Sequence, residues 1–360
     1  MRALRVLIVV ASTERRGAEV EGTQLTAHLA AAGLDASVVA LCAGAAPALD
    51  IDVLGAAPLG FGTLRALRRR AAGVDVAIAY GSSALPACAL ALIGTRTPFI
   101  YRSIGDPGRW VRGRVHRLRT AVLFRRAAHV VALWPAGAQS ISDLFNVPGD
   151  RVTCIANARP PVSALLPSKE AARAHLGLPA LGPVIAWVGA LSSEKRPELA
   201  LRVVAEVADG FLVIAGAGPL QSAVTDGAGA LLARRHRFLG VLDDLGPLWA
   251  AADVVLLTSR TEGMPGALIE AALHGVPATA VDVGAVSTVV IDTVTGRVVS
   301  AEADVATISA AVEETLANAD RLGMAAAAHA AGQFTWSVVA PQWVALVNRV
   351  RSQRRSTRSP

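Results

Sequence analysis

Two glutamates, Glu262 and Glu270, flank a seven-residue segment that contains Gly-Met-Pro-Gly, and their types and spacing point to ligand binding. An ionised carboxylate only accepts hydrogen bonds, so it suits a pair of neighbouring hydroxyl groups. A helix that begins between the two glutamates adds free N–H groups and the positive end of a dipole, which attract an anion. Hydroxyls and a phosphate together describe a nucleotide sugar. The alternative is that both glutamates are surface charges, since charged side chains are mostly exposed.

The elements that must position these glutamates are predicted from the flanking sequence. The apolar run 251–258 predicts a strand that ends near Thr258, followed by a short loop that carries Glu262. A helix is predicted to begin near Pro265, because proline suits the first helical turn, and to end at Gly275. The N-terminus of this helix then lies at the carboxyl end of a strand, which is where an anion site is expected.

This segment resembles the Glu-x7-Glu signature of the family 4 retaining glycosyltransferases, which have the GT-B fold. Other segments are similar to elements of that family in the same order, namely V-G-A-L-S-S-E-K-R-P at 188–197, L-V-I-A-G-A-G-P-L at 212–220, F-L-G-V-L at 238–242, A-T-A-V-D-V-G-A at 278–285 and V-T-G-R-V-V at 294–299. The resemblance covers the C-terminal half almost throughout and the N-terminal half more loosely. It implies an α/β chain of two Rossmann-like, doubly wound parallel-sheet domains that face a cleft.

The resemblance implies a donor site for a nucleotide-diphosphate sugar in the C-terminal half. Lys195 is expected to stabilise the leaving diphosphate, with a surface position as the alternative. Arg196 is expected to help, because Ala190 stands where the family usually has an arginine. Glu270 is expected to bind the ribose hydroxyls and Glu262 to lie near the donor sugar. Further donor contacts are expected from Gly189, Leu242, Gly263, Met264, Gly266 and Ala267.

The acceptor side is expected in the N-terminal half. Gly17 lies in the place of the family's glycine-rich first loop, where it allows close backbone approach to the diphosphate or acceptor, and Arg16 is expected to reach the acceptor. A basic surface turn is the alternative. The family's histidine after strand 99–101 is absent, so Asp106 becomes the candidate for a weak base, although Gly-Asp-Pro is also a turn signal. The departing phosphate oxygen can itself accept the acceptor proton, so the missing histidine does not exclude activity.

The length of 360 residues and the 53% hydrophobic content fit two α/β domains. We expect an N-terminal acceptor domain at 1–157, a proline-rich linker at 158–182 and a C-terminal donor domain at 183–335. The resemblance implies that a final helix at 336–350 crosses back to the N-terminal domain, and a disordered basic tail is expected at 351–360. The apolar runs predict strands at 6–11, 37–41, 74–80, 98–101, 129–134, 152–155, 184–188, 211–215, 237–239, 254–258 and 278–281.

Positive charge is concentrated in the N-terminal half. Residues 1–156 contain 18 arginines and no lysine against 10 acidic residues, a net charge of +8, whereas the whole chain carries +7. The stretch 109–126 interleaves arginines with apolar residues, which is typical of an amphipathic helix on an anionic membrane. A solvated arginine-rich face is the alternative. Nucleic acid is not an expected partner, because no stacking aromatic residues accompany the arginines.

No apolar run reaches the roughly 18 residues that a membrane-spanning helix needs. The first apolar run, 6–11, is expected to be a β-strand rather than a signal peptide. Three cysteines lie far apart without metal-ligand spacing and are expected to be reduced. No metal site is evident, and no cofactor is expected besides the nucleotide-diphosphate sugar that acts as donor substrate. We expect a cytoplasmic protein that is peripheral on the inner face of the plasma membrane.

The sequence therefore predicts a metal-independent, retaining hexosyltransferase. Its donor is expected to be a UDP- or GDP-sugar, and its acceptor a cell-envelope, lipid-linked or small molecule. Ala190 and the absent histidine motivate an alternative, a catalytically inactive GT-B protein that binds a nucleotide sugar. A nucleotide-sugar epimerase of the same fold is not favoured, because its histidine and carboxylate pattern is not evident.

Overall fold

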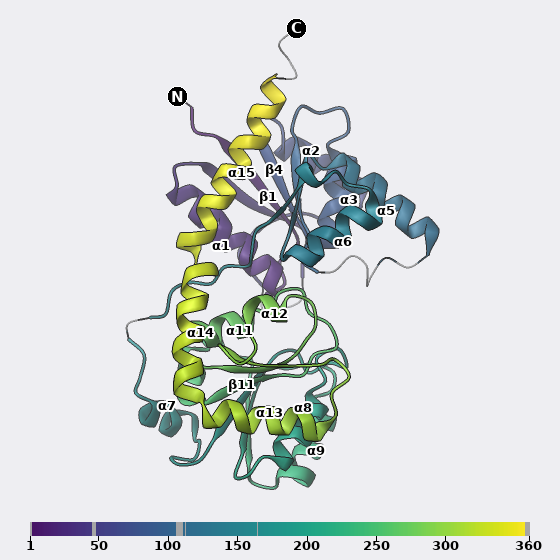
Figure 1. Cartoon of the computed structure of the whole chain (residues 1–360). Coiled ribbons are helices and arrows are strands. Elements are labelled where there is room, and N and C mark those ends of the chain that lie inside the picture. The colour runs from purple at the N-terminus through teal and green to yellow at the C-terminus, as the bar shows by residue number, and fades with distance from the viewer. Residues whose placement is uncertain (1, 45–47, 106–110, 112, 164, 357–360) are drawn as a thin grey trace. The chain divides into compact units, whose positions relative to one another are not determined.

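The structure is a computed structural model of the chain, and it describes residues 2–44, 48–105, 111, 113–163 and 165–356. It divides into two compact units, the first made of Met1–Ala158 with Trp336–Pro360 and the second of Arg159–Thr335. Each unit contains one parallel sheet covered by helices (Figure 1). The predicted fold class, α/β with two Rossmann-like parallel sheets, is confirmed.

The sheet of the first unit has seven parallel strands in the order β3-β2-β1-β4-β5-β6-β7. Successive residues of β1 point to opposite faces, and both faces are buried, with Leu7 and Val9 in one hydrophobic cluster and Val6, Ile8 and Val10 in another. Burial on two sides explains why the strands read as continuous apolar runs. The strands are β1 (Arg5–Ser12), β2 (Asp35–Cys42), β3 (Asp52–Gly55), β4 (Val76–Tyr80), β5 (Phe99–Arg102), β6 (His129–Ala132) and β7 (Val152–Cys154).

Helices cover both faces of this sheet. One cluster joins the sheet to α1 (Gly17–Ala31) and α15 (Trp336–Ser356). The other joins it to four helices, α2 (Phe61–Arg70), α3 (Gly81–Ala91), α5 (Arg114–Arg126) and α6 (Pro135–Phe145). The C-terminal helix thus belongs to the first unit, where Trp343 stacks on Tyr80 with ring centroids 6.3 Å apart. The expectation of a disordered tail from residue 351 is wrong as far as Ser356, because α15 continues to that residue.

The sheet of the second unit has six parallel strands in the order β10-β9-β8-β11-β12-β13. Its strands are β8 (Val184–Val188), β9 (Phe211–Ala215), β10 (His236–Gly240), β11 (Val254–Leu257), β12 (Ala278–Val281) and β13 (Gly296–Val299). Its helices are α7 (Lys169–Leu176), α8 (Pro197–Glu206), α9 (Gln221–Leu232), α10 (Gly246–Ala251), α11 (Gly266–Leu273), α12 (Val286–Val289), α13 (Val305–Ala317) and α14 (Ala319–Gln333).

Part of the segment predicted as a linker, 158–182, is packed into the second unit. Helix α7 lies against α10. Arg173 of α7 is only 5% exposed, and it donates to the Asp253 carboxylate at 2.7 Å and to the Ala251 carbonyl at 3.1 Å. The prolines indicated a linker around one short helical piece, and these long-range contacts hold that helix, α7, in the second unit.

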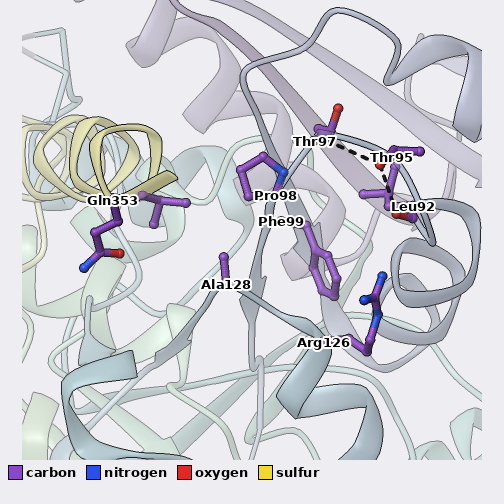
Figure 2. A pocket seen from close by; sticks show the side chains of 9 residues that line it. Leu92, Thr95, Thr97, Pro98, Phe99, Arg126, Ala128 and Gln353 are labelled. Carbon is purple, nitrogen blue, oxygen red and sulfur yellow. Dashed lines mark hydrogen bonds between the residues drawn. The ribbon is translucent and has the colours of Figure 1, made fainter. Parts of the chain in front are cut away.

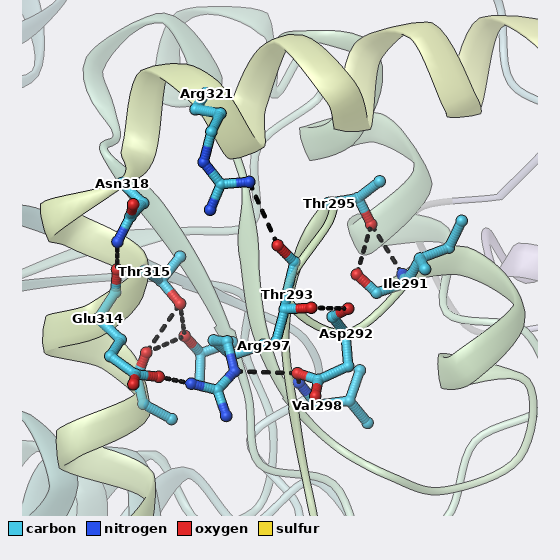
Figure 3. Close-up of polar contacts among 12 residues, drawn as sticks. Ile291, Asp292, Thr293, Thr295, Arg297, Val298, Glu314, Thr315, Asn318 and Arg321 are labelled. Atoms are coloured by element: carbon cyan, nitrogen blue, oxygen red, sulfur yellow. Dashed lines mark hydrogen bonds and ion pairs between the residues drawn. The ribbon is translucent and has the colours of Figure 1, made fainter.

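A polar network attaches the edge strand β13 to the helices beside it (Figure 3). Arg297 of β13 donates from Nε to Asp292 Oδ1 at 2.9 Å and forms an ion pair with Glu314 of α13. Arg321 of α14 donates to the carbonyl of Thr293 at 3.3 Å. These contacts hold the turn between α12 and β13 and give the segment 294–299 a structural role.

Arg102, at the end of β5, is the centre of a buried polar network in the first unit. Its side chain is fully buried and donates to Glu21 of α1 at 3.1 Å and to Asn157 at 2.9 Å. It also donates to the carbonyls of Ile155 and Ala156, and its guanidinium lies 5.5 Å from the centroid of Trp343. One side chain therefore joins β5, α1, α15 and the segment after β7.

We expect Arg102→Leu to destabilise the chain by about 3–5 kcal/mol, because it removes the cation that compensates the buried Glu21 carboxylate. Urea unfolding followed by tryptophan fluorescence measures the change. Arg70→Leu is the matched control, since the pair of Arg70 with Asp52 is exposed and surface pairs contribute at most about 1 kcal/mol. Equal effects of the two substitutions would contradict the role of the buried network.

Candidate active site

The strand order of the second unit creates a natural ligand position. Strand β9, which follows β8 in sequence, lies on one side of β8, and β11 lies on its other side. The direction in which strands are added therefore reverses between β8 and β11. In open parallel sheets, ligands bind beyond the carboxyl ends of the strands at such a reversal. Lys195 follows β8 and Glu262 follows β11. The topology therefore brings together two residues that are 67 positions apart.

Lys195 and Glu262 form a close ion pair. The Lys195 Nζ lies 2.6 Å from Glu262 Oε1, and the Ser259 hydroxyl donates to the same oxygen at 2.6 Å. The Glu262 side chain is 9% exposed and that of Lys195 is 26% exposed. The carboxylate is therefore held by two donors, while about a quarter of the Lys195 side chain stays exposed.

The hydroxyl of Thr258 joins the ends of β8 and β11. It accepts from Trp187 Nε1 at 3.0 Å and lies 3.0 Å from the carbonyl oxygens of Lys195 and Arg196. The Arg260 N–H also donates to the Glu194 carbonyl at 2.8 Å. These bonds fix the loop that carries Lys195 against the loop that carries Glu262.

Glycines let the neighbouring turns press against the backbone of these loops. A Cβ on Gly216, which has φ +136°, would collide with the Gly189 carbonyl oxygen. A Cβ on Gly284, at φ +61°, would collide with the Glu262 carbonyl oxygen. The Ala285 N–H donates to the Gly263 carbonyl at 2.8 Å. The glycine turn after β9 and the turn after β12 thus shape the loops on either side of the site.

Glu270 lies on α11 and pairs with an arginine that the sequence analysis missed. Its Oε1 is 2.6 Å from Nε of Arg159, with side-chain exposures of 28% for Glu270 and 14% for Arg159. Helix α11 begins at Gly266, one residue later than predicted, because Pro265 occupies the capping position with extended backbone. No local pattern signals Arg159, since it lies 111 residues before its partner, in the predicted linker.

The other predicted donor residues occupy the loops around this pair of glutamates. Gly189 and Leu242 are half-buried in the loops after β8 and β10, and Met264 is 5% exposed in the loop before α11. Gly266 and Ala267 are the first residues of α11, and no side chain caps that helix end. Their donor roles stay predictions.

Arg196 lines a cavity of the second unit. Arg202 and Arg260 line the same cavity, and burial together with these two positive charges lowers the pKa of Arg196. The other residues that line this cavity are Ser193, Glu198, Leu199, Ala303, Asp304 and Val305. Lys195 and both glutamates do not line this cavity, and the expectation that Arg196 helps to bind the diphosphate stays a prediction.

The predicted acceptor residues lie in the first unit. Arg16 immediately precedes α1, its side chain is 70% exposed, and it pairs with Glu14 at 2.8 Å. Gly17 is the exposed first residue of α1, and a Cβ there would meet no atom within 4 Å, so no described neighbour requires a glycine. Asp106 lies outside the described residues.

The first unit contains a second cavity, which lies at the amino ends of strands β5 and β6 (Figure 2). It is lined by Pro98 and Phe99 at the start of β5, Ala128 before β6, Arg126 of α5, Val350 and Gln353 of α15, and the loop residues Leu92, Thr95 and Thr97. Ligands of parallel sheets bind at the carboxyl ends of the strands, whereas this cavity is at the amino ends. It contains none of the predicted site residues.

Among the residues that the structure describes, no group of three or more His, Cys, Asp or Glu side chains is arranged to hold a metal ion. Within the same residues, no helix combines the length and apolar character needed to cross a membrane.

Comparison with known proteins supports the interpretation of the second unit. Residues 182–318 match the family model described as glycosyl transferases group 1. D-inositol 3-phosphate glycosyltransferase of Nocardia farcinica is 31% identical over 236 residues, which cover 60% of this chain and 51% of the relative. The corresponding protein of Mycolicibacterium gilvum is 35% identical over 178 residues, covering 47% of this chain and 40% of the relative. The chain thus spans about half the length of the curated relatives it matches.

Solved structures match the chain over nearly its whole length. HepE of Anabaena, in complex with UDP and glucose, has a TM-score of 0.81 at 20% identity and covers 96% of this chain and 99% of its own. Sucrose-phosphate synthase of Thermosynechococcus elongatus also has a TM-score of 0.81, at 18% identity, with coverages of 97% and 100%. These matches confirm the GT-B fold, and with the family match they confirm the resemblance that the Glu262 and Glu270 segment carried.

We expect Gly216→Ala to destabilise the second unit by about 1–3 kcal/mol, because alanine is strained at φ +136° and its methyl group meets the Gly189 carbonyl. Urea unfolding measures the change. Gly229→Ala in α9 is the control, since its Cβ would meet nothing within 4 Å and alanine favours a helix by about 0.5–1 kcal/mol. A neutral Gly216→Ala would show that the close approach is not needed.

Proposed function

We propose that this GT-B chain, whose residues 182–318 match the glycosyl transferases group 1 model, is a family 4 glycosyltransferase that transfers a hexose from a nucleotide-diphosphate sugar to an acceptor with retention of configuration. The observation that carries the proposal is the arrangement at the carboxyl edge of the second sheet. There, Lys195 pairs with Glu262, Arg159 pairs with Glu270, and the N-terminus of α11 lies between the two glutamates in the sequence.

The donor that fits this arrangement is a UDP- or GDP-sugar. Glu270 keeps 28% of its side chain exposed, so its carboxylate can accept hydrogen bonds from two ribose hydroxyls. Glu262 belongs near the donor sugar. Support for a uridine nucleotide comes from the structural relative HepE, whose complexes contain UDP, UDP with glucose, and UDP-glucose.

The chemical difficulty of the reaction is the negative charge that develops on the diphosphate as the anomeric bond breaks. Lys195 supplies a cation, and the first N–H groups of α11 supply dipoles, so both stabilise that charge without a change of protonation. The departing phosphate oxygen accepts the proton of the acceptor hydroxyl on the face where the new bond forms. We propose that this charge stabilisation does not require a metal ion.

The acceptor is proposed to be a cell-envelope, lipid-linked or small molecule that meets the carboxyl edge of the first sheet. Arg16, which immediately precedes α1, is an exposed cation of this unit. The sequence relatives are named for D-inositol 3-phosphate, a small hydroxylated molecule that carries a phosphate. An acceptor with a phosphate suits an exposed arginine. Asp106 remains the candidate for orienting the acceptor hydroxyl.

A cytoplasmic location at the inner membrane face is proposed from α5. Val115, Leu118 and Val122 are 71%, 66% and 52% exposed, and their spacing places them on one side of the helix. Exposed arginines of α5 lie beside this apolar stripe, at Arg114, Arg119, Arg125 and Arg126. An apolar stripe with arginines beside it fits the surface of an anionic membrane.

The second candidate function is a catalytically inactive protein that binds a nucleotide sugar. Ala190 and the absent histidine after β5 favour it, since both remove polar groups from the expected catalytic set. Binding of a nucleotide sugar without hydrolysis or transfer, over a broad set of acceptors, distinguishes this candidate from an enzyme.

The donor site is tested by calorimetric titration of UDP, GDP, ADP and their common sugars, in the presence of EDTA. We expect one nucleotide series to bind, and Glu270→Ala to weaken it by about 1–3 kcal/mol, because a charged hydrogen-bond acceptor for the ribose is lost. Glu313→Ala on α13 is the control, since that glutamate lies outside the site. No nucleotide binding by the wild type, or equal binding by Glu270→Ala and the wild type, would refute the proposed donor site.

The membrane proposal is tested by sedimentation with vesicles of phosphatidylcholine and phosphatidylglycerol. Arg114→Gln with Arg119→Gln on α5 is expected to weaken binding at least about tenfold, because each arginine near an anionic surface contributes about 1 kcal/mol. Arg65→Gln with Arg69→Gln on α2 removes the same charge from another exposed helix. Equal losses from both pairs would show a general charge effect and refute a specific surface on α5.

A further inference from the structure

We infer that Arg159, the first residue of the second unit, is a diphosphate-binding residue of the donor site. The inference rests on the proposed function and adds to it a residue that the sequence resemblance did not include. It starts from the position of the guanidinium, which contacts both the predicted ribose-binding carboxylate and the first residue of α11.

The guanidinium occupies space that only a glycine leaves open. Its Nε is 2.6 Å from Glu270 Oε1, and a Cβ placed on Gly266 would collide with the terminal nitrogen Nη2. The Nε therefore faces the glutamate, while an Nη group lies directly over the start of α11. An arginine presents five N–H donors in a rigid plane, so one edge can hold the carboxylate while another meets a phosphate.

The backbone of Arg159 is anchored, which makes its direction reproducible. Its N–H donates to the Phe334 carbonyl at 2.8 Å, and it forms a parallel bridge with Thr335. Two prolines, Pro160 and Pro161, follow and restrict the chain further. With a side chain only 14% exposed, the arginine is held in the site rather than extended into solvent.

Without Arg159, the predicted diphosphate-binding residues supply little positive charge to a bound diphosphate. Lys195 is already paired with Glu262 at 2.6 Å. Ala190 offers no charge, and Arg196 lines a different cavity. A nucleoside diphosphate whose ribose is bound by Glu270 would carry its phosphates past the start of α11, where Arg159 lies. Arginine suits this task because its planar N–H groups match phosphate oxygens.

The test separates contact with phosphate from positioning of Glu270. Uridine, UMP and UDP, or the matching series for the base that binds, are titrated into the full chain by calorimetry. Arg159→Gln is expected to weaken UDP binding at least about tenfold, as the loss of a charged hydrogen-bond donor should, and to change uridine binding by less than about threefold. Arg159→Lys is expected to fall between, because it keeps the charge but loses the planar fork.

Three outcomes decide the inference. Unchanged UDP binding by Arg159→Gln overturns it. Equal weakening of uridine and UDP also overturns it, because the arginine would then act only by positioning Glu270. Failure of the wild type to bind UDP, GDP or ADP refutes the proposed function itself. Arg297→Gln, which removes an ion-paired arginine at the edge of the same sheet, is the control for general electrostatic effects, and the thermal midpoint of each variant shows whether the unit remains folded.

Discussion

Close contact between backbone segments at the carboxyl edge of the second sheet is the constraint on which the site depends. Gly216 and Gly284 let the turns after β9 and β12 lie against the loops after β8 and β11. With Cβ atoms at these positions, both loops would have to move, and Lys195 and Glu262 would move with them. Thr258 then fixes the two loops to each other through a single buried hydroxyl. The positions of Lys195 and Glu262 thus depend on the two glycines, which have no side chains to separate the turns from the loops.

The charges of the site are arranged as two pairs rather than as a cluster of one sign. Each glutamate has its own cation at 2.6 Å, Lys195 for Glu262 and Arg159 for Glu270. Pairing offsets the cost of burying a carboxylate, which is greatest for Glu262 at 9% exposure and smaller for Glu270 at 28%. It also fixes each cation beside the place where a diphosphate is proposed to bind, so the ligand meets donors that are already oriented.

Much of the fold was predictable because the central strands of both sheets are buried on both faces, so their sequences are continuous apolar runs. The bounds of β8, β9 and β12 agree with prediction to the residue. The short edge strand β3 was missed, since it is exposed and begins with an aspartate. Helix α3 was missed as well, because Gly81, two serines and Pro86 indicate a turn rather than a helix. Within the site, the motif around Glu262 and Glu270 located the loops, but only packing decides which cation each glutamate contacts.

Two arginines that no local pattern distinguishes lie close to the point where the chain passes from the first unit to the second. In the first unit, Arg102 donates to Asn157 and to the carbonyls just before it. In the second unit, Arg159 pairs with Glu270. On one side of the boundary between Ala158 and Arg159, the buried Arg102 fixes Asn157 within the first unit. On the other side, Arg159 itself is fixed within the second unit by Glu270. Proline content predicted a domain linker here, and the contacts that fix its start come from residues 55 and 111 positions away. Such contacts depend on the completed fold, which is why Arg159, the residue proposed to bind the diphosphate, stood outside every pattern in the sequence.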